Sequence, residues 1–342
     1  MSDFVVHKHL QAAGTFSRDY GMEVTDVKFE HDMPTAITLA DGRIGAGTCI
    51  GCGSAPCMKK HEHELTLFGT LNAFPGDPNL DVCPTRAIRW DDDNAVAIVA
   101  AEDCIGCGLC ISRCPYGAIS MANGLTACVE TNDPDGLIVG GHFEGEHSHP
   151  QYSGRIAKLD APAASNLLNT VAALDDTRTT LLVRNLLNEI GLSIRTRRRG
   201  DTNMRIDAVG FSRDKRPFIA EIEMTTGVLE SPRALLEDVA VLHSRYGYGV
   251  KDIDLVSVIL AFPNVRSEYY QVIRDIEKVL GLRCHTITIG VIVAMLWNGV
   301  RLVGFTSNAF TIGGEMIDLA NCLGIEEART TEPYPGAFRP SK

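Results

Sequence analysis

The pattern of apolar and polar positions is most regular between residues 176 and 310. Apolar residues at helical spacing before Gly191 predict a helix, and nearly continuous apolar runs further on predict buried strands. Ser231-Pro232 supplies an N-cap and a first-turn proline for a second helix. We therefore expect helices over residues 179–190, 231–246 and 269–280. We expect strands over residues 193–199, 205–212, 218–225 and 255–262, and a last buried strand over 286–297.

The rest of the chain has shorter and less regular patterns. Alternating residues over 22–29 and 35–39, with Asp41-Gly42 as a turn signal, predict a β-hairpin. Residues 131–175 have no sustained period and many turn-forming residues, so we expect a linker there. Histidines in the loops are expected to be solvated, with a metal site as the alternative: His61, His63, His142, His147 and His149.

Length and composition describe a soluble protein. The chain has 342 residues, 45% of them hydrophobic and 22% charged, which is enough for two domains with cores. Its N-terminus lacks the basic start and apolar core of a signal peptide. The longest apolar run, residues 287–297, is too short to span a bilayer. We therefore expect a cytoplasmic protein without a membrane segment.

Charge is divided unevenly along the chain. The formal net charge of −11 argues against general affinity of the whole molecule for nucleic acid. Residues 176–310, however, carry 18 Lys/Arg against 15 Asp/Glu, whereas the remaining residues carry 14 against 28. Any contact with a polyanion is therefore expected in the C-terminal domain.

Eight of the eleven cysteines fall into two related groups. The second group reads Cys104-Ile-Gly-Cys107-Gly-Leu-Cys110-Ile-Ser-Arg-Cys114-Pro115. The first group reads Cys49-Ile-Gly-Cys52-Gly-Ser-Ala-Pro-Cys57 and continues later with Cys83-Pro84. Because the pentapeptide Cys-Ile-Gly-Cys-Gly occurs at 49–53 and again at 104–108, the pattern indicates an internal duplication.

This duplicated pattern resembles the bacterial-type ferredoxins that hold two [4Fe-4S] clusters. In that family three cysteines of one motif and the Cys-Pro cysteine of the other hold each cluster. The resemblance implies that Cys49, Cys52, Cys57 and Cys114 hold one cluster. It implies that Cys104, Cys107, Cys110 and Cys83 hold the other. Eight thiolates also require a reducing compartment during assembly, in keeping with a cytoplasmic protein.

The first motif departs from the ferredoxin spacing in two places. Four residues separate Cys52 from Cys57, and 25 residues separate Cys57 from Cys83. We expect residues 58–82 to loop out without moving the ligands. Zinc ligation and disulfides are the alternatives for the eight cysteines. The other three are expected to be buried thiols: Cys128, Cys284 and Cys322.

A second group of polar residues is predicted within the C-terminal sheet. Glu221 and Glu223 are two positions apart on the third predicted strand, so both point to the same face. Asp207, on the neighbouring strand, can complete a carboxylate group. Like charges raise one another's pKa unless a cation lies among them, and hard oxygen ligands suit Mg²⁺.

The order of elements, together with Ile206-Asp207 and Glu221-Ile-Glu223, resembles the PD-(D/E)xK nuclease superfamily. The resemblance implies that Asp207 and Glu221 bind Mg²⁺, which would activate a water for phosphodiester cleavage. It also implies an auxiliary acid on the first helix, where Glu189 falls on the predicted buried face. Glu223 stands where the family usually has lysine, and it would act as a base or second metal ligand.

Basic residues lie beside this predicted site. Arg195, Arg197, Arg198 and Arg199 form a strand and turn suited to phosphate contacts. The alternatives are an ordinary sheet with solvated Glu221 and Glu223, or a nuclease fold without catalysis.

The sequence therefore predicts a two-domain protein of the α/β and α+β classes, with a ferredoxin-like domain and a restriction-endonuclease-like mixed sheet flanked by helices. Its leading function would be Mg²⁺-dependent cleavage of nucleic acid, with DNA as the expected substrate in view of the family. The alternative is an electron-transfer or redox-sensing protein with a redox partner, whose C-terminal domain only binds a partner or nucleic acid. An oxidoreductase subunit is a third interpretation, weakened by the lack of a nicotinamide or flavin fingerprint. The expected domains are 1–130, the linker 131–175, the nuclease-like domain 176–310, and a C-terminal helix and tail 311–342.

Overall fold

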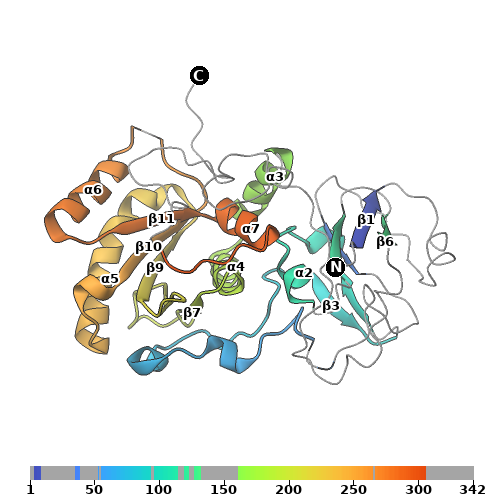
Figure 1. Cartoon of the computed structure of the whole chain (residues 1–342), viewed down its shortest axis with the longest axis horizontal. Helices are drawn as coiled ribbons and strands as arrows, with labels where there is room; N and C mark the ends of the chain where they lie inside the picture. The colour runs from blue at the N-terminus through green and yellow to red at the C-terminus, as the bar shows by residue number, and fades with distance from the viewer. Residues whose placement is uncertain are drawn as a thin grey trace. The chain divides into compact units, whose positions relative to one another are not determined.

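A computed structural model describes residues 4–8, 35–38, 53, 55–93, 96–114, 119–122, 127–131, 161–264 and 266–305 (Figure 1). Several predicted features lie outside the described residues: the segment 22–29, the C-terminal segment 311–342, and Cys49, Cys52 and Cys322. The chain divides into two compact units. Unit 1 comprises 1–61 and 80–158, and unit 2 comprises 62–79 and 159–342.

Within its described residues, unit 1 contains three two-stranded antiparallel sheets. In the first sheet β1 (Phe4–Lys8) pairs with β6 (Ala127–Thr131). In the second β2 (Thr35–Thr38) pairs with β5 (Ile119–Ala122). In the third β3 (Ile88–Asp91) pairs with β4 (Val96–Val99). A 3₁₀ turn, η3 (Ala101–Asp103), precedes the short helix α2 (Leu109–Arg113). The described partner of β2 is β5. The predicted hairpin of β2 with residues 22–29 stays a prediction, because those residues lie outside the described ranges.

Unit 2 contains a five-stranded mixed sheet in the order β11-β10-β9-β8-β7. The β7–β8 and β8–β9 pairs are antiparallel, and the β9–β10 and β10–β11 pairs are parallel. In chain order the strands are Ser193–Thr196, Ala208–Phe211, Pro217–Glu223, Asp254–Ile259 and Cys284–Thr288. This mixed α/β architecture agrees with the predicted class, but the sheet by itself does not show a nuclease.

Five helices accompany the sheet. They are α3 (Ala161–Ala172), α4 (Asp176–Glu189), α5 (Ser231–Tyr246), α6 (Glu268–Leu280) and α7 (Ile289–Trp297). The described part of the unit also has four 3₁₀ segments: η1 (Glu62–Leu65), η2 (Gly69–Ala73), η6 (Thr226–Glu230) and η7 (Val250–Asp252). None of the helices in the described ranges has both the length and the apolar character needed to cross a bilayer.

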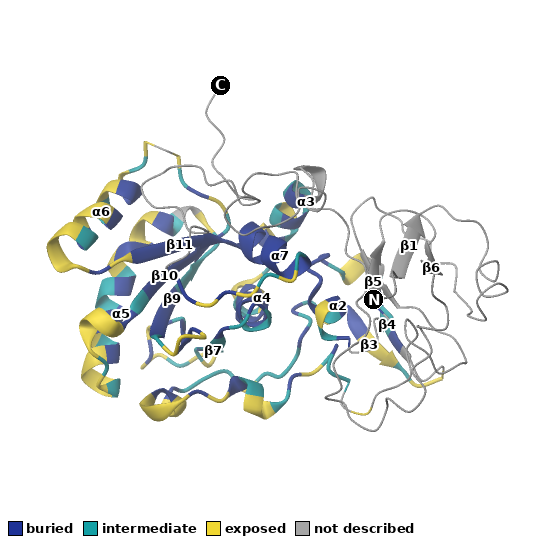
Figure 2. Cartoon of the chain, in the orientation of Figure 1, coloured by how far each residue is buried: buried dark blue, intermediate teal, exposed yellow. Residues whose placement is uncertain are grey.

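Local signals explain where the helices begin and end. Asp175 caps α4 by accepting a hydrogen bond from the Arg178 backbone at 2.9 Å. Ser267 caps α6, which ends at Gly281 in the left-handed region with φ 69°. On α5, Leu235, Val239 and Leu242 are buried, and Figure 2 shows strands β9, β10 and β11 as largely dark blue.

Two element predictions were wrong. The apolar run 286–297 is not a single strand, because β11 ends at Thr288 and α7 follows at once. The Thr288 side chain accepts a hydrogen bond from the Val291 backbone and so caps the new helix. A fully buried run has no polar face, so its period does not distinguish a strand from a helix. The predicted linker 131–175 likewise contains helix α3.

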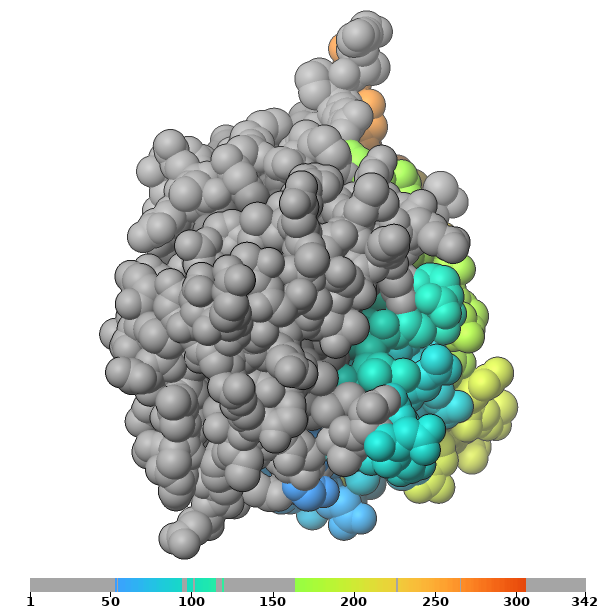
Figure 3. Space-filling model, turned by 90° about the vertical axis from the view of Figure 1, so that its right-hand side faces the viewer, coloured from blue at the N-terminus to red at the C-terminus, as the bar shows by residue number. Residues whose placement is uncertain are grey.

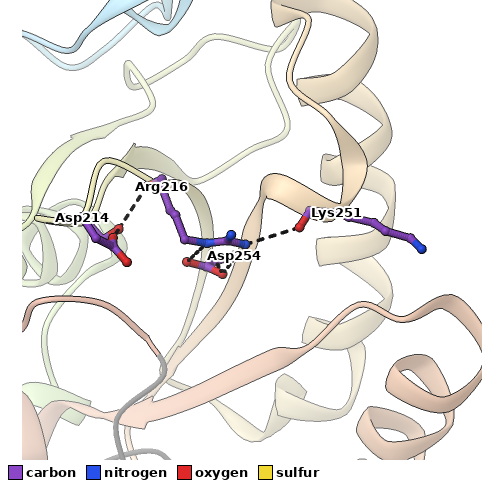
Figure 4. Close-up of polar contacts among 5 residues, drawn as sticks. Asp214, Arg216, Lys251 and Asp254 are labelled. Atoms are coloured by element: carbon purple, nitrogen blue, oxygen red, sulfur yellow. Dashed lines mark hydrogen bonds and ion pairs between the residues drawn. The ribbon is translucent and has the colours of Figure 1, made fainter.

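An ion pair fixes the starts of the central parallel strands (Figure 4). The Arg216 guanidinium, just before β9, lies 3.2–3.3 Å from the carboxylate oxygens of Asp254 at the start of β10. It also donates to the Lys251 carbonyl at 3.3 Å. Asp254 is therefore satisfied by a cation at this end of the sheet. The carboxylates at the other end of β9 have a different environment.

Candidate functional site

The 104–114 motif folds as a tight turn followed by α2. Gly106 and Gly108 flank Cys107 with φ values of 68° and 83°, a region that glycine adopts without steric strain. These two residues allow the backbone to wrap around Cys107, which is buried, as are its neighbours Ile105 and Leu109. Part of the turquoise stretch of chain that carries this motif reaches the surface in Figure 3.

Four cysteines lie within electrostatic reach of one another, and they are the set implied for one cluster: Cys83, Cys104, Cys107 and Cys110. Burial raises the pKa of the Cys107 thiol, and Cys83 and Cys104 raise it further. Burial also raises the pKa of Cys110, with added effects from the other three members and from Cys57. Four thiolates crowded in a buried place repel one another, so the arrangement fits a cationic iron centre that offsets their charge.

The other implied ligand set is only partly described. Cys57 and Cys114 are buried, while Cys49 and Cys52 lie outside the described residues. Across the described ranges, no three Cys, His, Asp or Glu side chains are placed closely enough to form a single-ion site. Cys284 is a buried thiol of β11, as predicted, and burial raises its pKa to about 12.

The insertion between Cys57 and Cys83 leaves and returns through one point, which we call the neck (residues 58–60 and 80–82). The Val82 backbone donates to the Met58 carbonyl at 2.9 Å, and the Lys60 backbone donates to the Leu80 carbonyl at 2.8 Å. Between these bonds, Lys59 pairs with Asp81 through both backbone and side chain. The neck therefore brings the chain back beside its starting point before Cys83.

A carboxylate cluster lies in unit 2, where β9 ends and β8 begins. It comprises Asp207, Glu221 and two acids that the sequence analysis did not select, Asp238 and Asp176. Asp238 lies on α5, is only 2% exposed and shares a hydrogen bond with Glu221. Asp176, in the first turn of α4, is close enough to raise the pKa of Asp207.

Burial raises the pKa of all three central carboxyls. Burial followed by the charge of Asp207 raises the pKa of Glu221 to about 9. Burial raises the pKa of Asp238 to about 6, although its hydrogen bond with Glu221 opposes the shift. Glu221 is therefore protonated at neutral pH in the absence of a cation and can donate its proton to Asp238. The second oxygen of Asp238 is buried and has no hydrogen-bond partner.

Asp207 already has two partners. One of its oxygens accepts a hydrogen bond from the Ile222 backbone at 3.2 Å, where the β8–β9 ladder ends. The other lies 3.4 Å from the guanidinium of Arg197. Burial raises the Asp207 pKa, and these two contacts oppose the increase.

Glu223 lies close enough to Asp207 to raise its pKa, as Asp176 does. Glu223 is turned toward the next segment, where it accepts hydrogen bonds from the backbone and hydroxyl of Thr225 at 2.8 and 2.5 Å. The structure does not bring Glu189 to the carboxylate cluster. It ends α4, about 20 Å along the helix from Asp176 at 1.5 Å per residue. The acid of α4 that acts on Asp207 is Asp176, at the other end of the helix.

The predicted basic strand is also divided. Arg195 donates to three backbone carbonyls of residues 62–79, so its guanidinium does not lie free for phosphate. Arg197 faces Asp207 and also donates to the Met204 carbonyl at 3.0 Å. Arg198 and Arg199 are exposed beside them.

Comparisons with known proteins concern the cysteine motifs. A family model described as the LdpA Fe-S cluster-binding domain matches residues 76–124. The chain is 32% identical over 104 residues to an uncharacterized ferredoxin of Methanocaldococcus jannaschii, covering 30% of this chain and 48% of the relative. It is 30% identical over 96 residues to the arsenate respiratory reductase iron-sulfur subunit of a Shewanella species, covering 21% and 41%.

A third relative is matched over a longer stretch. The chain is 26% identical over 175 residues to the formate dehydrogenase iron-sulfur subunit of Wolinella succinogenes, covering 46% of this chain and 76% of the relative. The chain spans less than half the length of the first two relatives. No solved structure matches it. The chain therefore carries an iron–sulfur cluster-binding, ferredoxin-like domain, and none of these three relatives is named as a nuclease.

The four-thiol group predicts a selective loss of iron. For the two four-iron clusters that the ferredoxin resemblance implies, Cys83→Ala should lower the content from about eight iron atoms per chain to about four, because one cluster loses a ligand. Iron and sulfide analysis of anaerobic protein measures this, with Cys284→Ala as the matched control that keeps the full content. Equal iron in both variants would contradict ligation by Cys83.

The Glu221 carboxyl predicts a pH-dependent stability. Its folded-state pKa of about 9 lies above the ordinary value of 4.5. The contribution of Glu221 to the free energy of unfolding is therefore complete below about pH 4.5 and is lost as the pH rises through about 9. Glu221→Gln, which stays neutral, should flatten the fall in Tm between pH 6 and 9. For a domain of this size, each kcal/mol of change in the free energy of unfolding shifts Tm by about 2–4 °C.

Calorimetry without divalent cations measures this effect, and Glu230→Gln on the exposed surface of the same unit is the control. A wild-type slope in Glu221→Gln would show that Glu221 is ionised throughout this range.

Proposed function

We propose that this chain is a ferredoxin-type electron-transfer protein that accepts and passes on single electrons through two [4Fe-4S] clusters. The gathering of Cys83, Cys104, Cys107 and Cys110 carries this proposal, because the ligands of one cluster come from both halves of the duplicated motif. The clusters would supply the redox chemistry. The chain's own residues would hold them, exclude most water and set their distance from the surface.

Partial exposure of the ligands suits exchange with a partner. Within the described residues, Cys83 and Cys104 are only half-buried, while Cys107 is buried. A cluster held by the four thiols would therefore lie near the surface. The named functions of the relatives, as iron–sulfur subunits of arsenate reductase and formate dehydrogenase, support a redox enzyme as the partner.

The charge of unit 1 supports a basic docking surface on that partner. Residues 1–61 and 80–158 contain 11 Lys/Arg against 18 Asp/Glu. Complementary charge accelerates encounter, and salt weakens this effect. A cationic electron donor should therefore reduce the protein faster at low ionic strength.

Electron uptake can be tested directly. Anaerobic protein mixed with reduced methyl viologen, a radical cation, should take up about two electrons per chain, one for each cluster. The absorbance near 400 nm should bleach, with a rate that falls as salt is added. A protein with full iron and sulfide that takes up no electrons would contradict the proposal. Full electron uptake at a salt-independent rate would contradict only the proposed docking of a basic partner surface.

A second activity, nucleic-acid cleavage, rests on unit 2 and is separate from the first. The observation in its favour is that Glu221 shares a hydrogen bond with Asp238 and lies within electrostatic reach of Asp207, at one end of a mixed sheet with the predicted strand and helix order. The buried Asp238 oxygen without a hydrogen-bond partner suits a cation. Mg²⁺ would supply an acidified water and stabilise a leaving oxygen.

The residues of unit 2 would then have separate roles in binding the cation and positioning the phosphate. Glu221 and Asp238 would hold the cation and give up their shared proton as it binds. Arg197 holds Asp207 in place, and the exposed Arg198 and Arg199 could position a phosphate backbone. Glu223, occupied with Thr225, would have to turn away from that residue to take part.

Cleavage is tested with the full chain and its clusters. Wild-type protein should cut plasmid DNA or single-stranded nucleic acid with Mg²⁺, and EDTA should stop it. Glu221→Ala should lower the rate at least a hundredfold, because a cation ligand is lost, while the exposed Glu230→Ala should not. No metal-dependent cleavage of any DNA or RNA by wild-type protein would end this second proposal and leave the electron-transfer proposal unaffected.

A further inference from the structure

Residues 62–79, which we call the strap, interrupt the cluster motif and yet belong to unit 2. The strap continues the sheet beyond the end of β7. The Asp77 backbone donates to the Thr196 carbonyl at 2.9 Å, and the Arg198 backbone donates to the Pro75 carbonyl at 3.0 Å. Gly76 and Arg197 form the antiparallel pair between these two bonds.

The strap is packed like part of a core. Leu65, Leu67, Leu71 and Phe74 are 6%, 3%, 0% and 2% exposed. The Thr70 hydroxyl donates to the carbonyl of Tyr246, the last residue of α5, at 2.7 Å. Burial of this extent is typical of a segment that stays on its surface rather than of a solvated loop.

Arg195 is the central polar contact of the strap. Its guanidinium donates to the carbonyls of Asn72 and Phe74 at 2.8 and 3.3 Å, and to the carbonyl of Leu65. One side chain of β7 thus bonds both 3₁₀ segments of the strap and the turn that follows them. A Cβ at Gly76 would lie 3.0 Å from the Arg195 side chain, so this position suits glycine.

Both ends of the strap lead to the neck, and the neck leads directly to two cysteines. Cys57 precedes Met58, and Cys83 follows Val82. Cys110 lies within electrostatic reach of both. The strap is therefore connected through the neck to Cys57 and Cys83, while its own residues pack within unit 2.

We propose that the strap couples cluster retention to unit 2: strap docking on β7 and cluster binding at Cys57 and Cys83 stabilise each other. A docked strap limits how far the neck can open, so less chain entropy is lost when the two ligands are brought together. The coupling is reciprocal, so a bound cluster also favours the docked strap. Because Arg197 pairs with the strap and faces Asp207, loss of the clusters would reach the carboxylate cluster.

This inference rests on cluster binding and on neither proposed activity. Hydrogen exchange with mass spectrometry on the full chain, with clusters and after anaerobic chelation, measures strap docking. Amides of residues 62–79 and 193–199 should exchange at least tenfold faster without clusters. Amides of β10, in the centre of the sheet, should not change. Equal exchange of the strap in both states would overturn the proposal.

The reciprocal effect is measured as cluster loss. Arg195→Met, which keeps much of the side-chain length but removes all donors, should speed chelator-driven bleaching near 400 nm at least threefold. Arg233→Met, an exposed arginine on α5 of the same unit, is the matched control and should bleach at the wild-type rate. Thr70→Val removes a single hydroxyl donor and serves if Arg195→Met does not fold.

Wild-type rates of cluster loss in the folded Thr70→Val and Arg195→Met variants would overturn the coupling. Iron and sulfide analysis of wild-type protein separates this result from a failure of the cluster assignment, since that failure would appear before any variant is compared.

Discussion

The neck is the constraint that places Cys57 and Cys83 relative to each other. The resemblance to two-cluster ferredoxins assigns Cys57 and Cys83 to different clusters, yet 25 residues separate them in the chain. The paired segments 58–60 and 80–82 remove that separation by returning the chain to its starting point. The inserted residues are then available for another purpose, and they pack on unit 2. Ligand placement and strap docking are thus consequences of one short antiparallel contact.

The two candidate sites present the same physical problem in different chemistry. In each, groups that carry like charge when ionised are gathered where water is limited, and burial raises their pKa. Thiolates are soft ligands, so iron is the cation that suits the first group. Carboxylates are hard, and without a cation Glu221 keeps its proton and shares it with Asp238. Only the thiol group has the support of known relatives, so the electron-transfer proposal is the better founded.

Sequence reasoning succeeded where a pattern has one structural meaning. The cysteine spacing predicted an iron–sulfur cluster-binding domain, and the helix signals around α5 and α6 gave the ends of these helices closely. It failed where local pattern is ambiguous. Asp238 lies within the apolar stripe of α5 between Leu235 and Val239, and a charge at that position could have indicated the site. No local signal showed that Arg195 would bond the strap, because that contact joins residues more than 120 positions apart.

The central claim is that the gathered thiols hold cubane iron–sulfur clusters. A Mössbauer spectrum of anaerobically purified, ⁵⁷Fe-enriched wild-type protein tests this most directly, because it distinguishes iron in a four-iron cluster from single iron ions. We predict one family of signals, from [4Fe-4S] clusters, that accounts for nearly all the iron. A spectrum dominated by isolated iron ions, or a protein that holds zinc and almost no iron after iron-replete growth, would contradict it.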